Sequence, residues 1–213
     1  MKAVIFDMDG VIIDSEPIHN TVILSTLDHF GIPFNAADLS KFVGTTNTSL
    51  FNKLITKHAL DISPTTINDY HYKNLRTTIL KELSEPISGI RQLLSTIKHY
   101  HLATAIASSS SLDLINSVTQ KFNISDYFQH LTSGENLPHS KPDPTIYLLT
   151  AKKLGVSPAD CLVIEDAHLG VKAAKAAGMT CIGFQNPNSG NQDLSAADKI
   201  VTSITEINLS EYL

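Results

Sequence analysis

Short apolar runs recur along the chain without polar residues alternating between them. They occupy residues 3–6, 102–107, 161–164 and 180–184. A strand that is buried on both faces shows such a continuous run, whereas a strand with one solvated face alternates between apolar and polar residues. The pattern therefore predicts buried strands at these four places, as in a parallel sheet.

Segments with helical spacing lie between these runs. Apolar residues recur every three or four positions within 90–97 and again within 147–154, which is typical of one buried helix face. Strand and helix therefore alternate after about residue 84. This alternation predicts an α/β fold with a doubly wound parallel sheet.

The stretch from residue 14 to residue 83 breaks the alternation, because it contains helical spacing but no strand-like run. It is followed by Glu85-Pro86, a pair that favours a turn. We predict an α-helical domain at 14–83, inserted into an α/β core made of residues 1–13 and 84–213.

The composition of the chain excludes several classes of protein. Its 213 residues are 42% apolar and 17% charged, with a net charge of -5. A chain of this length buries roughly 70% of its unfolded surface, so it needs no disulfide or structural zinc. Without a dense run of Lys and Arg, we expect neither nucleic acid nor a membrane surface as a partner. We expect a monomer that binds a small molecule.

The location can also be predicted from the sequence. No apolar run approaches the roughly 20 residues that a bilayer requires. Counted from the N-terminus, acidic residues begin after only six positions, at Asp7, too early for a signal peptide. Cys161 and Cys181 lie in apolar segments without a CxxC partner, which indicates buried, inert thiols. We therefore expect a cytoplasmic protein.

Candidate chemistry follows the ends of the predicted strands, where open parallel sheets bind ligands. The first strand is followed by Asp7, Asp9 and Gly10. One interpretation is a polar strand end with an Asp-Gly turn. The other is catalytic: the carboxylate of Asp7 attacks a phosphoryl group, and Asp9 protonates the leaving oxygen and later deprotonates water.

A run of serines, Ser108 to Ser111, follows the second predicted strand and opens a helix. Any of these hydroxyl groups can cap that helix. The free N–H groups of a helix start can also bind a phosphate. On that second interpretation we count Ser108, Ser109 and the turn residue Gly10 as phosphate-binding.

Lys141 lies between Ser140 and a Pro-Asp-Pro segment. A lysine in a loop is usually just solvated, but the two prolines restrict the backbone here. An ammonium group fixed beside Asp7 would offset the repulsion between a carboxylate nucleophile and a phosphate dianion.

Glu165 and Asp166 follow another buried strand and precede an alanine-rich helix. Asp166 can simply cap that helix. Alternatively, Asp7, Asp166 and the carbonyl of Asp9 can bind Mg²⁺, which prefers oxygen ligands, with Glu165 behind them. Together, the four places predict a phosphoryl-transfer site.

With these residues, the chain resembles the haloacid dehalogenase superfamily, and within it the β-phosphoglucomutase-like and sugar-phosphatase group. The resemblance covers essentially the whole chain and rests on DMDGV at 7–11, Ser108, SKPDP at 140–144 and IEDAHLGVKAAKAAGM at 164–179. It implies a Rossmann-like core with a helical cap, and Mg²⁺ as the cofactor. It also implies Asp7 as nucleophile, Asp9 as acid/base, Ser108 and Lys141 on the phosphate, and Asp166 on the metal.

The resemblance also implies residues of the cap that select the substrate. They lie in the segment DSEPIH at 14–19, which resembles the hinge into the cap, and in the cap loop VGTTN at 43–47. These residues are Glu16, His19, Gly44, Thr45, Thr46 and Asn47. Asn47 stands where the mutases carry an arginine for a second phosphate, and Ser111 stands where they carry a lysine. A neutral side chain does not replace a bidentate cation, so the sequence favours hydrolysis.

The predicted function is a Mg²⁺-dependent phosphatase that acts on a small sugar or polyol phosphate through an aspartyl-phosphate. A β-phosphoglucomutase-like phosphomutase is one alternative, and it would release an isomerised sugar phosphate. A non-enzymatic, receiver-like module that is phosphorylated on aspartate is another. Such a module needs neither the helical insertion nor a proton donor at Asp9. A dehalogenase has no use for a metal-binding acid pair.

Overall fold

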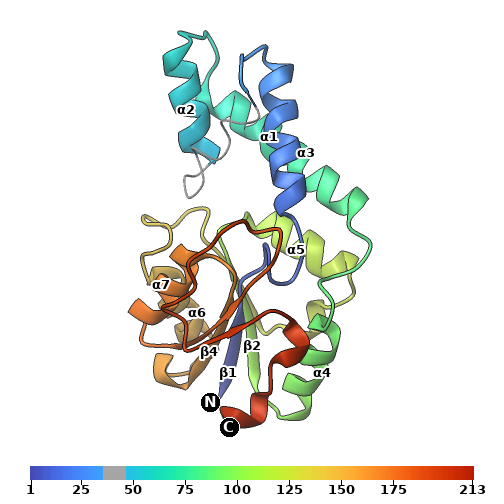
Figure 1. The fold of residues 1–213 in the computed structure, drawn as a ribbon, viewed down its shortest axis with the longest axis vertical. Helices are drawn as coiled ribbons and strands as arrows, with labels where there is room; N and C mark the ends of the chain where they lie inside the picture. Colours follow the sequence, from blue (N-terminus) through green and yellow to red (C-terminus); the bar gives the residue numbers. More distant parts are fainter. Residues whose placement is uncertain (36–46) are drawn as a thin grey trace. The chain divides into compact units, whose positions relative to one another are not determined.

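The computed structural model describes residues 1–35 and 47–213. The chain divides into two compact units, one made of Met1–Asp14 and Leu83–Leu213, the other within Ser15–Glu82. The first unit combines a sheet with helices, and the second is helical (Figure 1).

The α/β unit contains a six-stranded sheet in the order β3-β2-β1-β4-β5-β6, and all its neighbouring strands are parallel. The strands are β1 (Ala3–Phe6), β2 (Ala103–Ser108), β3 (His130–Ser133), β4 (Cys161–Glu165), β5 (Thr180–Phe184) and β6 (Lys199–Val201). This arrangement confirms the predicted doubly wound parallel sheet.

The four predicted strands are the inner ones, and their bounds differ little from the prediction. β2 begins and ends one residue later than predicted, and β4 extends to Glu165. The prediction missed β3 and β6, which form the two edges of the sheet. Both edge strands are short and only partly buried, so neither contains a continuous apolar run.

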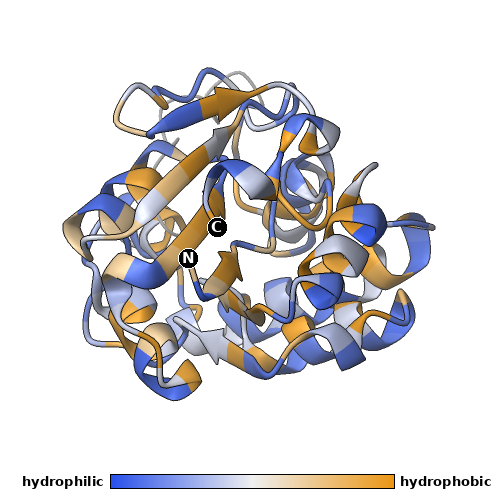
Figure 2. Cartoon of the chain, turned by 90° about the horizontal axis from the view of Figure 1, so that it is seen from below, coloured by the Kyte–Doolittle hydropathy of each residue, from blue (hydrophilic) through white to orange (hydrophobic). Residues whose placement is uncertain are grey.

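Helices cover both faces of this sheet. They are α4 (Ile90–His99), α5 (Leu112–Lys121), α6 (Thr145–Leu154) and α7 (His168–Ala176), with short 3-10 helices at Ser125–Tyr127, Pro158–Asp160, Ile204–Glu206 and Leu209–Glu211. Tyr147 of α6 and Val171 of α7 pack with Ile5 and Val163 in one core. Figure 1 shows α4 and α5 on the other side of the sheet. In Figure 2 the hydrophobic colour runs along the central strands between these layers.

The helical unit contains α1 (Glu16–His29), α2 (Asn47–Lys57) and α3 (Pro64–Glu82). Proline lies in the first turn of α1 and at the first residue of α3, where its missing N–H group removes no helical hydrogen bond. Both α1 and α2 pack against α3. Leu27, Phe51 and Ile67, one from each helix, are buried in their common core.

Both cysteines are buried and free, as the sequence predicted. Burial raises the pKa of the Cys161 thiol to about 11, which keeps it protonated and unreactive at neutral pH. Within residues 1–35 and 47–213, no helix has both the length and the hydrophobicity needed to cross a membrane.

The register of the sheet determines which loops meet. Phe6 pairs with Ile106 on one side and with Ile164 on the other. The residues that follow these three strands therefore emerge at one edge of the sheet. The strand order also reverses between β1 and β4, and open α/β sheets bind ligands beside such a reversal.

Candidate active site

The chain leaves β1 at Asp7 and turns at Gly10. The N–H of Asp7 donates to the carbonyl of Ile164 (3.0 Å), so Asp7 continues the pairing of β1 with β4. Gly10 has a φ of +78°, and a Cβ there would overlap the carboxyl group of Asp166. Only glycine combines this backbone conformation with so close an approach. The turn therefore brings the β1 loop against the end of β4.

Lys141 joins the β1 and β4 ends through two ion pairs. Its Nζ lies 2.5 Å from Oδ1 of Asp7 and 2.6 Å from Oε1 of Glu165. Only 11% of the lysine side chain is exposed, against 9% for Asp7 and 1% for Glu165. Burial alone would lower the pKa of Lys141, but the two carboxylates raise it above its ordinary value. The ammonium charge is thus retained in the interior.

Glu165 is held from several sides at once. The Tyr147 hydroxyl donates to its Oε1 at 2.8 Å. The N–H groups of Asp166 and Ala167 donate to its Oε2 at 3.0 Å each. Burial and the charge of Glu165 raise the pKa of Tyr147 well above its ordinary value, so Tyr147 remains a donor. With both oxygens engaged, Glu165 is suited to hold Lys141 in place.

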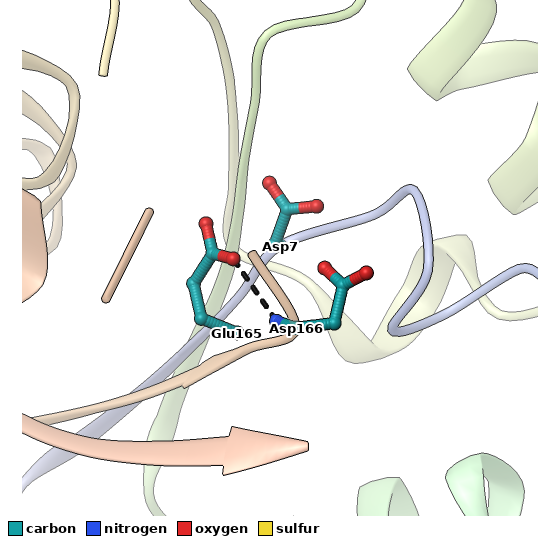
Figure 3. Close-up of side chains that lie close together, drawn as sticks. All are labelled: Asp7, Glu165 and Asp166. Atoms are coloured by element: carbon teal, nitrogen blue, oxygen red, sulfur yellow. Dashed lines mark hydrogen bonds between the residues drawn. The ribbon is translucent and has the colours of Figure 1, made fainter. Parts of the chain in front are cut away.

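Three buried carboxylates meet at these strand ends. One oxygen of each lies within 4.8 Å of the others, from Asp7, Glu165 and Asp166. Figure 3 shows the carboxyl groups together, with the hydrogen bond from the Asp166 N–H to Glu165. Burial, opposed by the Lys141 ammonium, raises the pKa of Asp7 to about 8, and the charges of Glu165 and Asp9 contribute to the rise.

The donor set fits a hard divalent cation. Oxygen ligands from carboxylates are what Mg²⁺ prefers. When ionised, the three carboxylates carry more negative charge than the single positive charge of Lys141, which contacts two of them, can neutralise. A divalent cation would neutralise the excess negative charge and favour the ionised form of Asp7. The Asp9 side chain lies outside this group of three, and the sequence prediction assigned its carbonyl, not its carboxylate, to the metal.

The carboxylate of Asp9 contacts the serine run instead. Ser110 Oγ donates to Oδ2 of Asp9 at 2.7 Å, and Ser108 Oγ makes a longer contact with the same oxygen at 3.4 Å. Ser108 is buried and lies at the last position of β2. Ser109 is exposed beside it. Asp9 is only half-buried, so its carboxyl group can exchange protons with a bound molecule or with water.

The structure shows which of the proposed helix caps form in these loops. Ser111 caps α5, since its Oγ accepts from the N–H of Leu114 at 3.3 Å. Asp166 does not cap α7: the cap position is Ala167, and it makes no side-chain cap. Capping is thus assigned to Ser111 and does not account for Ser108, Ser109 or Asp166.

The predicted substrate-selecting residues belong to the helical unit. Glu16 and His19 lie in α1, and Asn47 is the first residue of α2. The Asn47 amide nitrogen lies 3.0 Å from Nε2 of the buried His71. The other three, at 44–46, fall outside the described residues.

The sequence prediction missed several polar side chains of the site. Tyr147 was assigned only to an apolar helix face, yet its hydroxyl bonds Glu165. Ser110 was treated as one of several capping serines, although it is the closer contact of Asp9. Ser189 donates to Oδ2 of Asp166 from the segment after β5. The serine run was a signal for Ser110, whereas Ser189 lies in an irregular segment without a pattern.

The fold and these contacts define a class of protein: a doubly wound α/β protein with a buried lysine and acids at the sheet's topological reversal. A family model of haloacid dehalogenase-like hydrolases matches residues 4–184. The chain belongs to this family, as the sequence motifs predicted.

Individual relatives match over nearly the whole chain. Hexitol phosphatase B of Escherichia coli (strain K12) is 32% identical, covering 99% of this chain and 96% of its own length. The β-phosphoglucomutase of Bacillus subtilis (strain 168) is 31% identical, covering 98% and 92%. The crystal structure of CbbY from Rhodobacter sphaeroides, in complex with phosphate, has a TM-score of 0.88 at 22% identity and covers 100% of this chain and 99% of that one. This last likeness shows a shared fold.

Proposed function

We propose that this protein is a Mg²⁺-dependent phosphatase that hydrolyses a small sugar or polyol phosphate through an aspartyl-phosphate. The observation that carries the proposal is the position of Lys141, whose ammonium bridges Asp7 and Glu165 within the acidic cluster. A cation placed beside one carboxylate oxygen lowers the repulsion that a phosphate dianion would meet there.

Asp7 is the nucleophile in this proposal. One of its carboxylate oxygens attacks phosphorus while the bond from phosphorus to the substrate oxygen breaks. Asp9 donates its proton to that leaving oxygen, so the alcohol departs neutral. Two observations support this role: Asp9 lies two residues beyond Asp7 on the same loop, and it is only half-buried.

The second step regenerates the enzyme. Asp9, now ionised, takes a proton from water as the water oxygen attacks the phosphorus of the aspartyl-phosphate. The bond between phosphorus and Asp7 breaks, and inorganic phosphate is released. Ser110 and Ser108 contact one oxygen of Asp9 and hold the carboxyl group in position through both transfers. Ser108, Ser109 and the backbone at Gly10 are proposed to bind the transferred phosphoryl group.

Asp7 and Asp166, with the carbonyl of Asp9, would hold Mg²⁺, which supplies charge neutralisation for the phosphoryl group. Glu165 supports this set from behind through Lys141 and the backbone N–H groups of residues 166 and 167.

The substrate class is inferred from relatives and from the helical unit. Hexitol phosphatase B acts, by its name, on a hexitol phosphate, which favours a polyol or sugar phosphate here. We propose that Glu16, His19 and residues 44–47 select the non-reacting end of the substrate. The predicted cytoplasmic location and monomeric state agree with such a substrate and remain predictions.

A phosphomutase remains the second candidate because the Bacillus subtilis β-phosphoglucomutase is 31% identical to this chain. Asn47 counts against it. Its amide contacts His71, and a neutral amide cannot replace the arginine that the mutase resemblance requires for a second phosphate.

The test is phosphate release from a panel of hexitol, hexose and pentose phosphates, with the sugar products identified. We expect Asp7→Asn to lose at least about 10³-fold in turnover, as expected when a nucleophile is removed. Asp160→Asn is the matched control, since Asp160 pairs with Lys2 outside the site and should retain full activity.

Three results would contradict the proposal. Asp7→Asn could retain most of its activity, which would exclude the covalent step. An isomerised sugar phosphate without free phosphate would favour the mutase. A stable phosphoprotein that releases no phosphate would favour a receiver-like module.

A further inference from the structure

The segment between β5 and β6 borders the candidate active site, although no sequence pattern predicted a role for it. Asn186 is buried, and its amide donates to the carbonyl of Gly10 at 2.9 Å. The amide of Asn188 donates to the carboxylate of Asp14 at 2.5 Å. These hydrogen bonds join the segment to the β1 loop, which carries Asp7.

The same segment is also joined to the start of α7. The N–H of His168 donates to the side-chain oxygen of Gln192 at 3.0 Å. The amide of Gln192 donates in turn to the carbonyl of Ser189 at 3.0 Å. Ser189 is therefore held by its backbone, and its hydroxyl donates to Oδ2 of Asp166. The hydroxyl reaches the acidic cluster from outside the loops that form it.

Ser189, Asp166 and Gly10 are packed against one another. A Cβ at Gly10 would overlap the carboxyl group of Asp166 and lie 2.9 Å from Oγ of Ser189. Such packing leaves the carboxyl group little space to rotate. A hydroxyl donor fixes its orientation and leaves its negative charge intact, which is what a carboxylate ligand of a cation requires.

We infer that Ser189 is a positioning residue, which orients the Asp166 carboxylate for a divalent cation. The inference rests on the proposed function, since it assumes that Asp166 is a ligand. Removing outer partners of metal ligands typically weakens metal binding by about 10- to 100-fold. We expect a loss in that range when the hydroxyl of Ser189 is removed.

The experiment measures Mg²⁺ binding by isothermal titration calorimetry on the full chain. Ser189→Thr and Ser189→Val are the matched pair, because the two side chains have nearly the same shape and only threonine has a hydroxyl. The Kd for Mg²⁺ should rise at least about tenfold in the valine variant and stay within about threefold of wild type in the threonine variant. Ser195→Ala, at an exposed position further along the segment, should leave the Kd unchanged.

Turnover gives a second measurement on the same variants. In Ser189→Val, the Mg²⁺ concentration for half-maximal phosphate release should rise with the Kd, while kcat at saturating Mg²⁺ changes much less. A loss of kcat with no change in the Mg²⁺ requirement would overturn the inference. Should Ser189→Val lose its native circular dichroism spectrum, Ser189→Ala replaces it in the comparison with threonine, because alanine adds no atoms.

The outcomes separate this inference from the proposed function. A wild-type chain that binds Mg²⁺ and releases phosphate, with equal Kd values in the threonine and valine variants, would overturn the role of Ser189 alone. A wild-type chain that binds no Mg²⁺ would overturn the metal part of the proposed function and this inference with it.

Discussion

The two units of the protein each bury an ionisable side chain, but the buried group is charged in one unit and neutral in the other. In the α/β unit, Lys141 remains charged between Asp7 and Glu165. In the helical unit, His71 is completely buried and contacts neutral partners: Oγ1 of Thr26 at 3.3 Å and the amide of Asn47 at 3.0 Å. The buried charge of Lys141 is thus compensated by opposite charges in the α/β unit, whereas His71 of the helical unit is surrounded by neutral partners.

The difference follows from what surrounds each group. Burial lowers the pKa of His71 to about 4, and the neighbouring His19 adds to the effect. The hydrogen-bond partners of His71, Thr26 and Asn47, are neutral, so neither of them favours a protonated ring. Lys141 has two carboxylates within ion-pair distance, and they outweigh the cost of its burial. A buried group therefore keeps its charge only where the fold supplies a counter-charge.

The largest effect should come from removing the counter-charge at the strand ends. Lys141→Met keeps most of the side-chain volume and leaves Asp7 and Glu165 without their cation. Breaking a buried ion pair on one side costs about 3–5 kcal/mol of unfolding free energy, which urea unfolding would measure. Phosphate release should be lost as well, because the nucleophile would lose its neighbouring positive charge.

Lys2→Met is the control for this variant. Lys2 pairs with Asp160 at 2.7 Å, but 71% of its side chain is exposed. Exposed ion pairs contribute little to stability, so both stability and activity should stay near wild type. If Lys141→Met were as stable as Lys2→Met, the counter-charge interpretation of the strand ends would be wrong.

His71 should make the stability of the protein depend on pH. Its pKa is about 4 in the folded protein against 6.5 as the ordinary value, so the unfolded chain binds more protons between these two pH values. The stability that the neutral ring provides is complete above about pH 6.5 and is lost as the pH falls towards 4. The loss should reach about 3 kcal/mol, measured by urea unfolding at a series of pH values.

His71→Gln should flatten this pH dependence, because glutamine is polar but does not titrate. The matched control is His99→Gln, which removes an exposed histidine at the end of α4 and should leave the pH dependence as in wild type. Equal slopes for wild type and His71→Gln would show that His71 is charged or accessible in the folded state.

The same comparison explains how much the sequence could predict. Asp7, Lys141 and Asp166 follow or precede recognisable elements, and the parallel register brings strand ends together, so their meeting could be inferred from order along the chain. The inner strands were predicted for a similar reason, since complete burial requires a continuous apolar run. The edge strands β3 and β6 lack that run.

The residues that were missed depend on three-dimensional contacts with no local pattern. His71 looks like any polar residue in α3, and its burial depends on how α1 and α2 pack against that helix. Tyr147 fits an apolar helix face, and its hydroxyl finds Glu165 only when α6 lies on the sheet. Ser189 depends on the path of an irregular segment, which hydrophobic periodicity does not describe.

A smaller effect should come from Gly170, where α7 passes the buried carboxyl group of Glu165. A Cβ at this position would overlap that carboxyl group, which already accepts hydrogen bonds from Lys141, Tyr147 and two backbone N–H groups. By helix propensity alone, Gly170→Ala would stabilise α7 by roughly 1 kcal/mol. Overpacking in a constrained interior costs about 1–3 kcal/mol, so we expect a net loss of about 1 kcal/mol and reduced phosphate release.

The variant Gly155→Ala is the control, because it introduces backbone strain without the steric overlap that a Cβ makes at Gly170. Gly155 ends α6 with a φ of +68°, and no atom lies within 4 Å of a Cβ built there. Alanine should cost about 1 kcal/mol through its backbone conformation and leave phosphate release unchanged. The two variants would then lose similar stability, but only Gly170→Ala would lose activity, because only that change displaces the carboxylate that holds Lys141. A Gly170→Ala variant more stable than wild type and fully active would show that Glu165 can move aside without disturbing Lys141.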